Sequence, residues 1–412
     1  MSRIIVGISG GVDSSVAAYL LQKAGHEVIG CRMRTFDTPQ SLEEEQSAAE
    51  VAAKLGIPLY TVDMREAFAE NVIARFADEY AHGRTPNPCC ICNRLVKWQA
   101  LLTCMREHEA DLVATGHYAA VTKKHLLTDP AGFTSECAAD SSEQGAGFCV
   151  TRVASEKDQS YALYNLTQEE IAHTVFPLAD LSKGEVRDLA REAGLLTAEK
   201  PDSMEICFIP DNDYAGFLRG HFGIKDCPGN YVDEAGNVLG THQGIVHYTV
   251  GQRKGLGIAL GKRIFVKEIR PLTNEVVLAD DSDVFTDHIF VKDMNFQLLS
   301  PETPDLAFCD ATDGPSLQPG AAPGIRAACV KIRYADRGTP AIIRKVSAQD
   351  RQTAINAVMP GKTVFPETRA ASSAAGALYR LDFERSVRAA APGQAAVAYD
   401  EAGHILCGGT IL

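Results

Sequence analysis

The sequence predicts an α/β protein, with a doubly wound parallel sheet in its first part and β-rich modules after it. Strand-like and helix-like runs alternate from "RIIVGI" to "DLVATGH", which is typical of a parallel sheet covered by helices on both faces. From about Gly229 the pattern changes to short apolar runs separated by Gly, Pro and Asp. Such runs predict β-rich modules, with a barrel as the expected architecture.

The individual elements follow in chain order. Strands are predicted at residues 3–8, 27–33, 58–64 and 111–117, and helices at 14–25, at 47–56 and in a stretch that ends at Tyr80. In the β-rich part the expected strands include "IFVKEI", "EVVLA", "AACVKIRYA" and "AAVAYD". Segments 128–149, 300–324 and 366–376 are rich in Gly, Ser, Pro and Ala, so we expect mobile insertions there, to which the sequence assigns no role.

Length and composition limit the class of protein. The 412 residues have room for two or three domains, and 45% hydrophobic with 23% charged residues is ordinary for a soluble protein. Glycines interrupt the apolar N-terminus, and no run of about 18 apolar residues occurs, so we expect no membrane span and a cytoplasmic location. The net charge of −13 argues against nonspecific nucleic-acid binding but leaves room for a local basic face.

The segment "SGGVDSS", residues 9–15, follows the first predicted strand and opens into a helix. Its glycines let the backbone approach an anion, its hydroxyls can donate hydrogen bonds, and the helix N-terminus adds its dipole. The segment therefore predicts a phosphate site, with an ordinary glycine turn capped by serine as the alternative. It lacks the lysine of the GxxxxGK[ST] loop, which argues against transfer of a γ-phosphoryl group.

Three cysteines, Cys89, Cys90 and Cys92, lie within "TPNPCCICNRLVK". In a reducing cytosol, cysteines are more often buried apolar residues, metal ligands or redox groups than disulfides. The C-x-x-C spacing of Cys89 and Cys92 can bind a metal centre from a tight turn. Alternatively, Cys89 is a tolerated small residue and Cys90 a buried neighbour.

The loop resembles that of the pyrophosphatase-loop (PP-loop) ATPases, which include argininosuccinate synthase, GMP synthetase, NAD synthetase and tRNA thiolases. The rest of the chain selects among them, because it closely resembles the tRNA-specific 2-thiouridylases, the MnmA family, from end to end. The matching stretches are "SGGVDSSVAAYLL", "TPNPCCICNRLVKW", "ATGHYA", "EKDQSYALYNL", "KPDSMEICFIP", "GTHQGIVHYTVGQRKGLGI", "KIRYAD" and "APGQAAVAYD".

This resemblance implies an enzyme that uses ATP and Mg²⁺ to replace oxygen by sulfur at C2 of the wobble uridine of tRNAs of the Lys, Glu and Gln type. It implies a PP-loop catalytic domain at 1–208, a small central tRNA-binding domain at 209–283 and a C-terminal β-barrel at 284–412. It also implies a partner that delivers sulfur, either a cysteine desulfurase or a sulfur-relay protein.

The resemblance further implies roles for single residues, which suit their tasks because amides read an extruded base while cations and aromatic rings bind phosphates and bases. The residues expected to contact ATP are Gly7, Ile8, Ser9, Gly10, Gly11, Val12, Asp13, Ser14, Met33 and Gly116, with Asp13 placing Mg²⁺. The residues expected at the target base are Asn87, Pro88 and Cys89, and those expected to contact tRNA are His117, Lys157, Asp158, Gln159, Arg333, Tyr334 and Gln394. As alternatives, 157–159 could begin a solvated helix and Arg333 could pair with Asp336.

For the sulfur chemistry, the family's mechanism converts the C2 oxygen into an adenylate, from which a sulfur nucleophile displaces AMP. The resemblance places a persulfide on Cys207, in "EICFIP". It makes Cys92 the partner that releases the sulfur, either as hydrosulfide or with formation of a Cys92–Cys207 disulfide.

One position departs from the family. The common motif reads N-P-D-x-x-C-N, whereas this chain has Cys89 in place of the aspartate. A thiol, with an ordinary pKa of about 8.5, cannot simply replace a carboxylate. Together with Cys92 and Cys207 it supplies three thiolates that could hold a [4Fe–4S] cluster, as in the cluster-dependent tRNA thiolases that this trio resembles. Persulfide and cluster mechanisms both stay open.

Two other classes of function are alternatives. An ATP-dependent ligase resembling argininosuccinate synthase needs neither paired cysteines nor a barrel, and a small acid or amine would stimulate its pyrophosphate release without tRNA. A non-catalytic tRNA-binding sulfur carrier would bind tRNA or hold a persulfide without ATP turnover.

Overall fold

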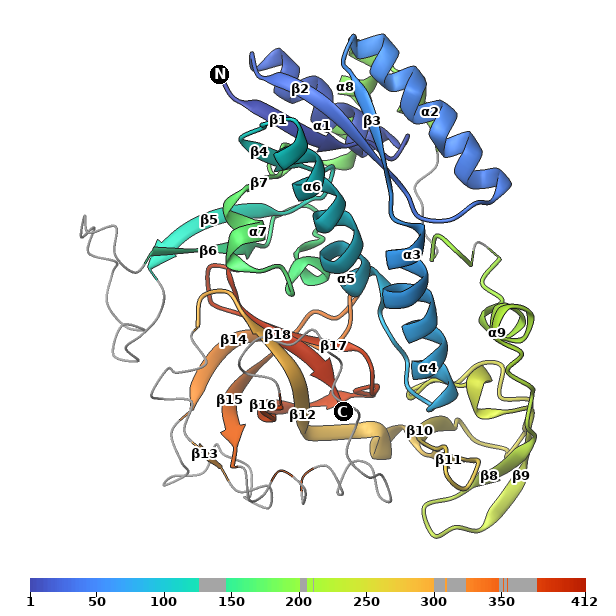
Figure 1. The fold of residues 1–412 in the computed structure, drawn as a ribbon. Coiled ribbons are helices and arrows are strands. Elements are labelled where there is room, and N and C mark those ends of the chain that lie inside the picture. The colour runs from blue at the N-terminus through green and yellow to red at the C-terminus, as the bar shows by residue number, and fades with distance from the viewer. Residues whose placement is uncertain are drawn as a thin grey trace.

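The computed structural model describes residues 1–125, 146–200, 206–209, 211–299, 308–309, 324–347, 351, 354 and 376–412. Figure 1 shows a helix-covered sheet at one end of the molecule, and a barrel and a small sheet next to each other at the other end. Within the described ranges, every helix is too short or too polar to cross a bilayer. The domain boundaries at 208/209 and 283/284 stay predictions.

The helix-covered part begins with a regular alternation of strands and helices. Its elements are β1 (Arg3–Gly7), α1 (Val12–Lys23), β2 (Glu27–Arg34), α2 (Pro39–Leu55), β3 (Leu59–Asp63), α3 (Arg65–Phe68), η1 (Ala69–Ala74), α4 (Arg75–Ala81), α5 (Pro88–Cys92), η2 (Asn93–Trp98), α6 (Gln99–Glu107), β4 (Leu112–Ala114), β5 (Ala120–His125), β6 (Ala146–Thr151), η4 (Ser160–Leu163), α7 (Gln168–Ala172), β7 (Thr174–Val175), α8 (Lys183–Glu192) and η5 (Leu196–Glu199).

The first sheet has the strand order β3-β2-β1-β4-β7, and all its pairings are parallel. The apolar side chains of β1 alternate between its two faces. Ile4 and Val6 pack with residues of α1, α2 and α8, whereas Ile5 packs with residues of α6. Because helices cover both faces, all three side chains are almost inaccessible to solvent. The prediction of a doubly wound α/β sheet is confirmed.

Two helical rods lead away from this sheet (Figure 1). One joins α3, η1 and α4, the other joins α5, η2 and α6, and each contains a π-helical segment. Arg84 braces the turn between the rods, since its guanidinium donates to both carboxylate oxygens of Glu79 at 2.5 and 2.9 Å. The second rod carries Cys92 and returns the chain to the sheet.

The hairpin of β5 and β6 corrects the expectation of a loop throughout 128–149. Residues 146–149 belong to β6, where Cys149 and Val150 are buried and the Val150 N–H donates to Gln297 Oε1 at 2.8 Å. These residues form a strand because they pair with β5 and pack on the barrel. The prediction of a loop rested on the Gly- and Ser-rich composition of the whole segment, which does not register such pairing. Residues 128–145 lie outside the described residues.

A second correction concerns 300–324, which is not a loop throughout. Phe308–Cys309 forms the short strand β13, which pairs in parallel with β15 and so satisfies backbone groups at the edge of that strand. Apart from these two residues and Gly324, the segment lies outside the described residues, as do residues 366–375 of the third predicted insertion.

The remaining elements form the small sheet and the barrel. They are α9 (Tyr214–Phe222), β8 (Gly229–Val232), β9 (Val238–His242), η6 (Ile245–His247), β10 (Phe265–Arg270), β11 (Glu275–Ala279), η7 (Asp281–Val284), β12 (Phe285–Phe296), β13, β14 (Ile325–Lys331), β15 (Thr339–Val346), β16 (Tyr379–Arg388), β17 (Ala395–Tyr399) and β18 (Ile405–Ile411). The small sheet has the order β10-β11-β8-β9 and a core around Tyr231 and Val276.

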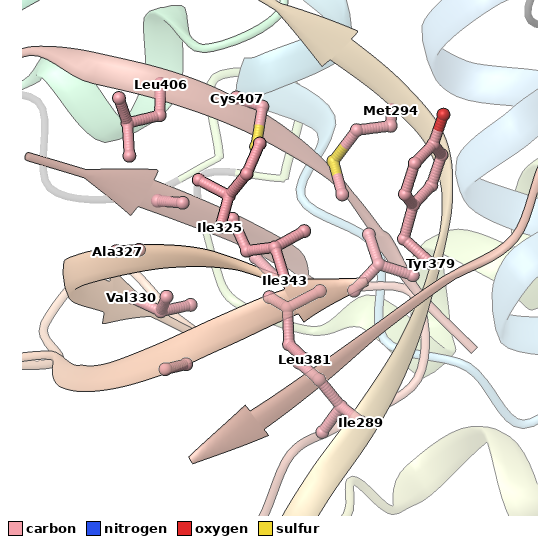
Figure 2. Packing of buried hydrophobic residues seen from close by; sticks show 14 of the residues in the cluster. Ile289, Met294, Ile325, Ala327, Val330, Ile343, Tyr379, Leu381, Leu406 and Cys407 are labelled. Atoms are coloured by element: carbon pink, nitrogen blue, oxygen red, sulfur yellow. The ribbon is translucent and has the colours of Figure 1, made fainter. Parts of the chain in front are cut away.

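The C-terminal strands close into a barrel. They pair in the order β15-β14-β17-β18-β12-β16, and β16 pairs again with β15, so six strands form a closed ring. Figure 2 shows side chains such as Ile325, Ile343, Leu381 and Leu406 from different strands meeting inside it. The predicted barrel is confirmed, and closure removes most of the exposed strand edge.

Candidate active site

The phosphate loop joins β1 to α1 in the predicted way. Gly10 has φ +77°, and a Cβ there would lie 2.7 Å from the backbone oxygen of Glu44, so only glycine fits. Gly11 is the N-cap of α1, and no side chain caps the first N–H groups of the helix. The hydroxyls of Ser14 and Ser15 instead donate to the Gly11 carbonyl at 3.1 and 2.8 Å. The helix N-terminus therefore offers unfilled donors to an anion.

The other residues expected to contact ATP lie around this loop. Ile8 and Val12 are buried behind it. A Cβ on Gly7 would lie 3.4 Å from Met33 Cε, and a Cβ on Gly116 would lie only 2.6 Å from the backbone of Asp13. The structure thus gathers them at the carboxyl ends of β1, β2 and β4, which is where doubly wound sheets bind ligands.

Asp13 is held by two donors that sequence reasoning missed. The ammonium of Lys183, the first residue of α8, lies 2.7 and 2.8 Å from its carboxylate oxygens, and Tyr118 Oη donates to it at 2.8 Å. Lys183 is 170 residues away in sequence, so the motif gave no signal of it. The expected Mg²⁺ ligand is an oxygen donor at the loop, but here it is paired with a cation.

A second lysine, Lys200, also reaches the loop. Its ammonium donates to Ser47 Oγ at 2.6 Å and to the Gly10 carbonyl at 3.2 Å, and Ser47 Oγ donates to the same carbonyl at 3.0 Å. Lys200 opens the stretch "KPDSMEICFIP" that carries Cys207. That position was the only sequence signal for it.

The turn at residues 85–92 carries Cys89, Cys90 and Cys92. Helix capping and contacts from two other parts of the chain hold it in place. Asn87 Oδ1 accepts from the Cys89 N–H at 3.2 Å and Pro88 is the first residue of α5, an arrangement that favours a helix start. The Thr85 N–H donates to the Pro392 carbonyl of the barrel at 2.7 Å. Thr85 Oγ1 also donates to Thr249 Oγ1 at 3.2 Å. The turn is therefore fixed before the cysteines begin.

The three cysteines of this turn face different environments. Cys89 is exposed, Cys90 is buried in a cluster with Trp98 and Tyr161, and Cys92 is buried. Cys90 thus matches the expectation of a buried neighbour. These three cysteines and Cys207 are free.

Cys207 lies in a turn closed by a hydrogen bond from the Ile209 N–H to the Ile206 carbonyl, at 2.8 Å. Phe208 anchors this turn edge-on against Phe68 and Phe76. It also packs against the apolar cluster that contains Cys92. The turn that carries Cys207 is therefore anchored on the cluster that contains Cys92, although the two cysteines are far apart in sequence.

Desolvation dominates the titration of both thiols. It raises the pKa of Cys92 to about 11, and that of Cys207 to about 12 even though Cys207 is an exposed residue overall. For Cys92, the ammonium of Lys97 lowers the pKa and the Cys89 thiol raises it by less. For Cys207, the Cys92 and Cys89 thiols raise the pKa further, and Lys97 lowers it by less. Both side chains are therefore thiols at neutral pH.

Alkylation should show this directly. Because each pKa lies above the range tested, the thiolate fraction of Cys92 and Cys207 should grow about 10-fold per pH unit from pH 7 to 10. We expect the iodoacetamide rate constants, followed residue by residue by mass spectrometry, to rise accordingly. A plateau near pH 8 would contradict the burial of these thiols.

The three thiols proposed as cluster ligands do not form a metal site in this arrangement. Among the described residues, no group of three or more His, Cys, Asp or Glu side chains is placed to hold a metal ion. Cys89, Cys92 and Cys207 therefore do not fit a [4Fe–4S] cluster as they stand.

A small pocket lies beside Asn87, between α4, α5 and the barrel residues Gly393 and Thr410. Its volume of about 20 Å³ has room for roughly one water molecule. It is too small for a uracil ring, so this pocket is not a binding site for the target base as it stands.

Several residues expected to contact tRNA have partners inside the protein. Gln159 Oε1 accepts from the Tyr118 N–H at 3.1 Å, and Gln394 Nε2 donates to the Thr85 carbonyl at 2.8 Å. Asp158 accepts from the Ser160 hydroxyl at 3.1 Å. These contacts tie the three side chains to neighbouring groups of the protein itself.

His117 is uncharged at neutral pH. Burial lowers its pKa to about 3, with Lys97 contributing, and its Nδ1 lies 2.8 Å from Thr115 Oγ1. Its ring also lies near the rings of Trp98 and Phe176. His117 can therefore offer tRNA a hydrogen bond but no phosphate ion pair.

Arg333 and Tyr334 are the exposed members of the expected tRNA face. The Asp336 carboxylate accepts from the Ile332 N–H at 3.2 Å, and within the described residues it forms no ion pair with Arg333. The ammonium of Lys331 lies 5.8 Å from the ring centroids of both Tyr161 and Tyr334. The Lys331 ammonium thus lies over the ring of Tyr334, a cation–π contact that helps to hold this exposed side chain in place. Lys157, the last of these residues, is partly buried.

Comparison with known proteins is consistent along the chain. Residues 2–211 match the family described as the tRNA methyl transferase HUP domain, and residues 215–280 match the tRNA methyl transferase PRC-barrel domain. The tRNA-specific 2-thiouridylase MnmA of Lachnoclostridium phytofermentans is 45% identical over 380 residues, covering 88% of this chain and 96% of that protein. The MnmA of Clostridioides difficile is 37% identical and covers 100% of this chain and 98% of its own length.

Among solved structures, the U34-tRNA thiolase NcsA from Methanococcus maripaludis with its [4Fe-4S] cluster overlaps 54% of this chain and 67% of its own. The TM-score is 0.31 at 19% identity, a likeness that carries no argument about this site. The curated relatives do not favour the ligase or the non-catalytic carrier. The chain belongs to the family of tRNA-specific 2-thiouridylases, MnmA.

Proposed function

We propose that this enzyme activates the C2 oxygen of the wobble uridine of tRNA with ATP and replaces it with sulfur carried by Cys207. The observation that supports this most strongly is that a phosphate loop without a P-loop lysine occurs together with a Cys207 turn that Phe208 anchors on the apolar cluster of Cys92. Glu44 connects the two centres. Its backbone oxygen lies against Gly10, and its carboxylate acts on the titration of Cys207.

In the first step, the C2 oxygen attacks the α-phosphorus of ATP. An O–P bond forms, the bond between the α-phosphorus and its bridging oxygen breaks, and pyrophosphate leaves with the electron pair. The N–H groups at the start of α1 bind the phosphates. Asp13 would hold Mg²⁺, which when bound shields phosphate charge. For this, the Asp13 carboxylate has to exchange the ammonium of Lys183 for the cation.

In the second step, the terminal sulfur of a persulfide on Cys207 attacks C2 and AMP leaves with its oxygen. The Cys92 thiolate then attacks the sulfur of Cys207, which breaks the bond to the transferred sulfur. The products are 2-thiouridine and a Cys92–Cys207 disulfide, which a thiol reductant must reduce by two electrons. Alternatively, Cys92 attacks first and releases hydrosulfide, which then displaces AMP; the electron count is the same.

The partners follow from this chemistry. A cysteine desulfurase or a relay protein must load the sulfur, and tRNAs of the Lys, Glu and Gln type are the proposed substrates. We place the reaction in the cytoplasm, where the free thiols of the described residues stay reduced. Because the three thiols do not fit a cluster as placed, no step uses one.

The test is a thiolation assay on unmodified tRNA with ATP and a sulfur source. Formation of 2-thiouridine should match formation of AMP and pyrophosphate, and neither should form without tRNA. ADP and orthophosphate as products would rule the mechanism out. Pyrophosphate release that needs a small acid or amine in place of tRNA would indicate a ligase, and tRNA binding without ATP turnover would indicate a carrier.

For tRNA binding, Arg333→Ala should weaken the complex and lower the slope of log affinity against log salt by about one unit, because one phosphate contact releases about one counterion. Filter binding at several salt concentrations measures this slope. Arg191→Ala, on the exposed face of α8 and paired with Asp188 and Glu199, is the matched control and should leave it unchanged. A slope unaffected by Arg333→Ala would place this residue outside the tRNA footprint.

A further inference from the structure

The phosphate loop contains no cation of its own, yet the fold brings two lysines to it from distant positions. The ammonium of Lys183 is matched by the carboxylate of Asp13. That of Lys200 contacts the Gly10 carbonyl and the Ser47 hydroxyl, which are both uncharged. Beside the same loop, Lys183 therefore has a carboxylate partner, whereas the contacts of Lys200 are with uncharged oxygens.

No carboxylate of the described residues lies within 4.0 Å of the Lys200 ammonium. Burial raises the pKa of Glu44, and the charge of Lys200 acts on the same carboxyl in the opposite direction. Arg32, another cation near α2, is already paired with Glu45 at 3.3 Å and donates to the Ser41 carbonyl. Lys200 is thus a loop-side cation whose charge is not met by a direct partner.

We propose that Lys200 is the phosphate-binding lysine of this enzyme, which contacts the β- and γ-phosphates of ATP and stabilises pyrophosphate as it leaves. The inference rests on the proposed function. Negative charge grows on the leaving pyrophosphate as the bond to the α-phosphorus breaks, and a preformed cation beside the loop lowers the energy of that state. The loop itself contains no lysine, and the fold supplies Lys200, which lies 190 residues after Gly10 in the chain.

The position of Lys200 also connects this contact with sulfur delivery. Lys200 follows η5 and precedes the turn of Cys207 in the chain. Phe208 fixes that turn against the helices that carry Phe68 and Phe76. Lys200 contacts the phosphate loop, and Phe208 contacts the helices beside Cys92. The proposed pyrophosphate-binding cation, Lys200, therefore lies only a few residues before Cys207, the thiol that acts in the next step.

The test compares Lys200→Gln, Lys200→Arg and wild type in tRNA-dependent formation of AMP. Glutamine can still donate to the Gly10 carbonyl but carries no charge, whereas arginine keeps the charge. We expect Lys200→Gln to raise the KM for ATP and the inhibition constant of pyrophosphate by about 10- to 100-fold, the effect of losing a charge-assisted hydrogen bond. Lys200→Arg should restore most of both, and the exposed Lys54→Gln should match wild type.

A second measurement uses the wild-type enzyme and does not depend on how the variants fold. Pyrophosphate at ten times its dissociation constant should slow acetylation of Lys200 about 10-fold by mass action, with Lys54 unaffected. Normal ATP and pyrophosphate constants in Lys200→Gln, or labelling of Lys200 that pyrophosphate does not slow, would overturn the inference and leave Lys200 as a brace of the loop. Wild-type enzyme that releases no pyrophosphate with tRNA would instead overturn the proposed function.

Discussion

Replacing Cys207 with serine is expected to stop thiolation of tRNA, with a fall in rate of about 10³-fold or more, as for loss of a nucleophile. Serine cannot carry a persulfide, so no sulfur reaches the adenylated base. Cys92→Ser should have a similar effect, since no thiolate then releases the transferred sulfur. Both variants should still release pyrophosphate with tRNA, and Cys207→Ser should leave the base adenylated, because AMP departs only when sulfur attacks C2. This result separates sulfur transfer from adenylation in one assay.

The matched controls come from the same turn and from an exposed cysteine elsewhere. Cys227→Ser should keep full activity, because Cys227 is exposed and lies outside the site. Cys89→Ser should keep substantial activity under the persulfide mechanism, and Cys89→Asp should restore the common family motif. Loss of activity and of bound iron in Cys89→Ser would instead support the cluster. Normal thiolation by Cys207→Ser would contradict both sulfur mechanisms.

Asp13→Asn is expected to slow adenylation by about 10²- to 10³-fold, which is the usual cost of removing one preorganised electrostatic group. Asparagine cannot balance the charge of Lys183 or hold Mg²⁺ as a carboxylate does. Affinity for tRNA should change by less than about 2-fold, because cations that contact phosphates dominate that binding. Quenched-flow measurement of pyrophosphate release and filter binding of tRNA report the two quantities separately.

Asp188→Asn is the control for Asp13→Asn. Asp188 lies on α8, like Lys183, but its side chain is exposed. It should adenylate at the wild-type rate. If Asp13→Asn also adenylates normally, the carboxylate serves only to anchor α8 against the loop, and its assignment to Mg²⁺ is wrong.

Much of the fold could be predicted because its signals are local. The apolar run of β1 needs helices on both faces, and Gly10 and Gly11 mark a sharp turn before a helix. The composition of their segments does not predict β6 and β13, because these strands form by pairing with β5 and β15. A strand of this kind is specified by what it pairs with rather than by its own residues.

In the candidate site, too, some residues could be predicted from the sequence, whereas their contacts could not. The resemblance singles out Cys92 and Cys207, yet only folding shows that Phe208 anchors the turn of Cys207 on the apolar cluster that contains Cys92. Gln159 and Gln394 match the family motif, but their amides bond to the backbone of Tyr118 and Thr85. Lys183 and Lys200 could not be found from the loop, since the tertiary fold alone brings them to Asp13 and Gly10.

The most direct test of the central claim follows a single sulfur atom. Enzyme is loaded with radiolabelled sulfane sulfur, freed of excess donor and reductant, and mixed with ATP and unmodified tRNA in one turnover. The label should move from Cys207 to 2-thiouridine in proportion to AMP formed, and peptide mapping should then find a Cys92–Cys207 disulfide. Label that stays on the protein while unlabelled sulfur enters the tRNA would contradict sulfur transfer through Cys207.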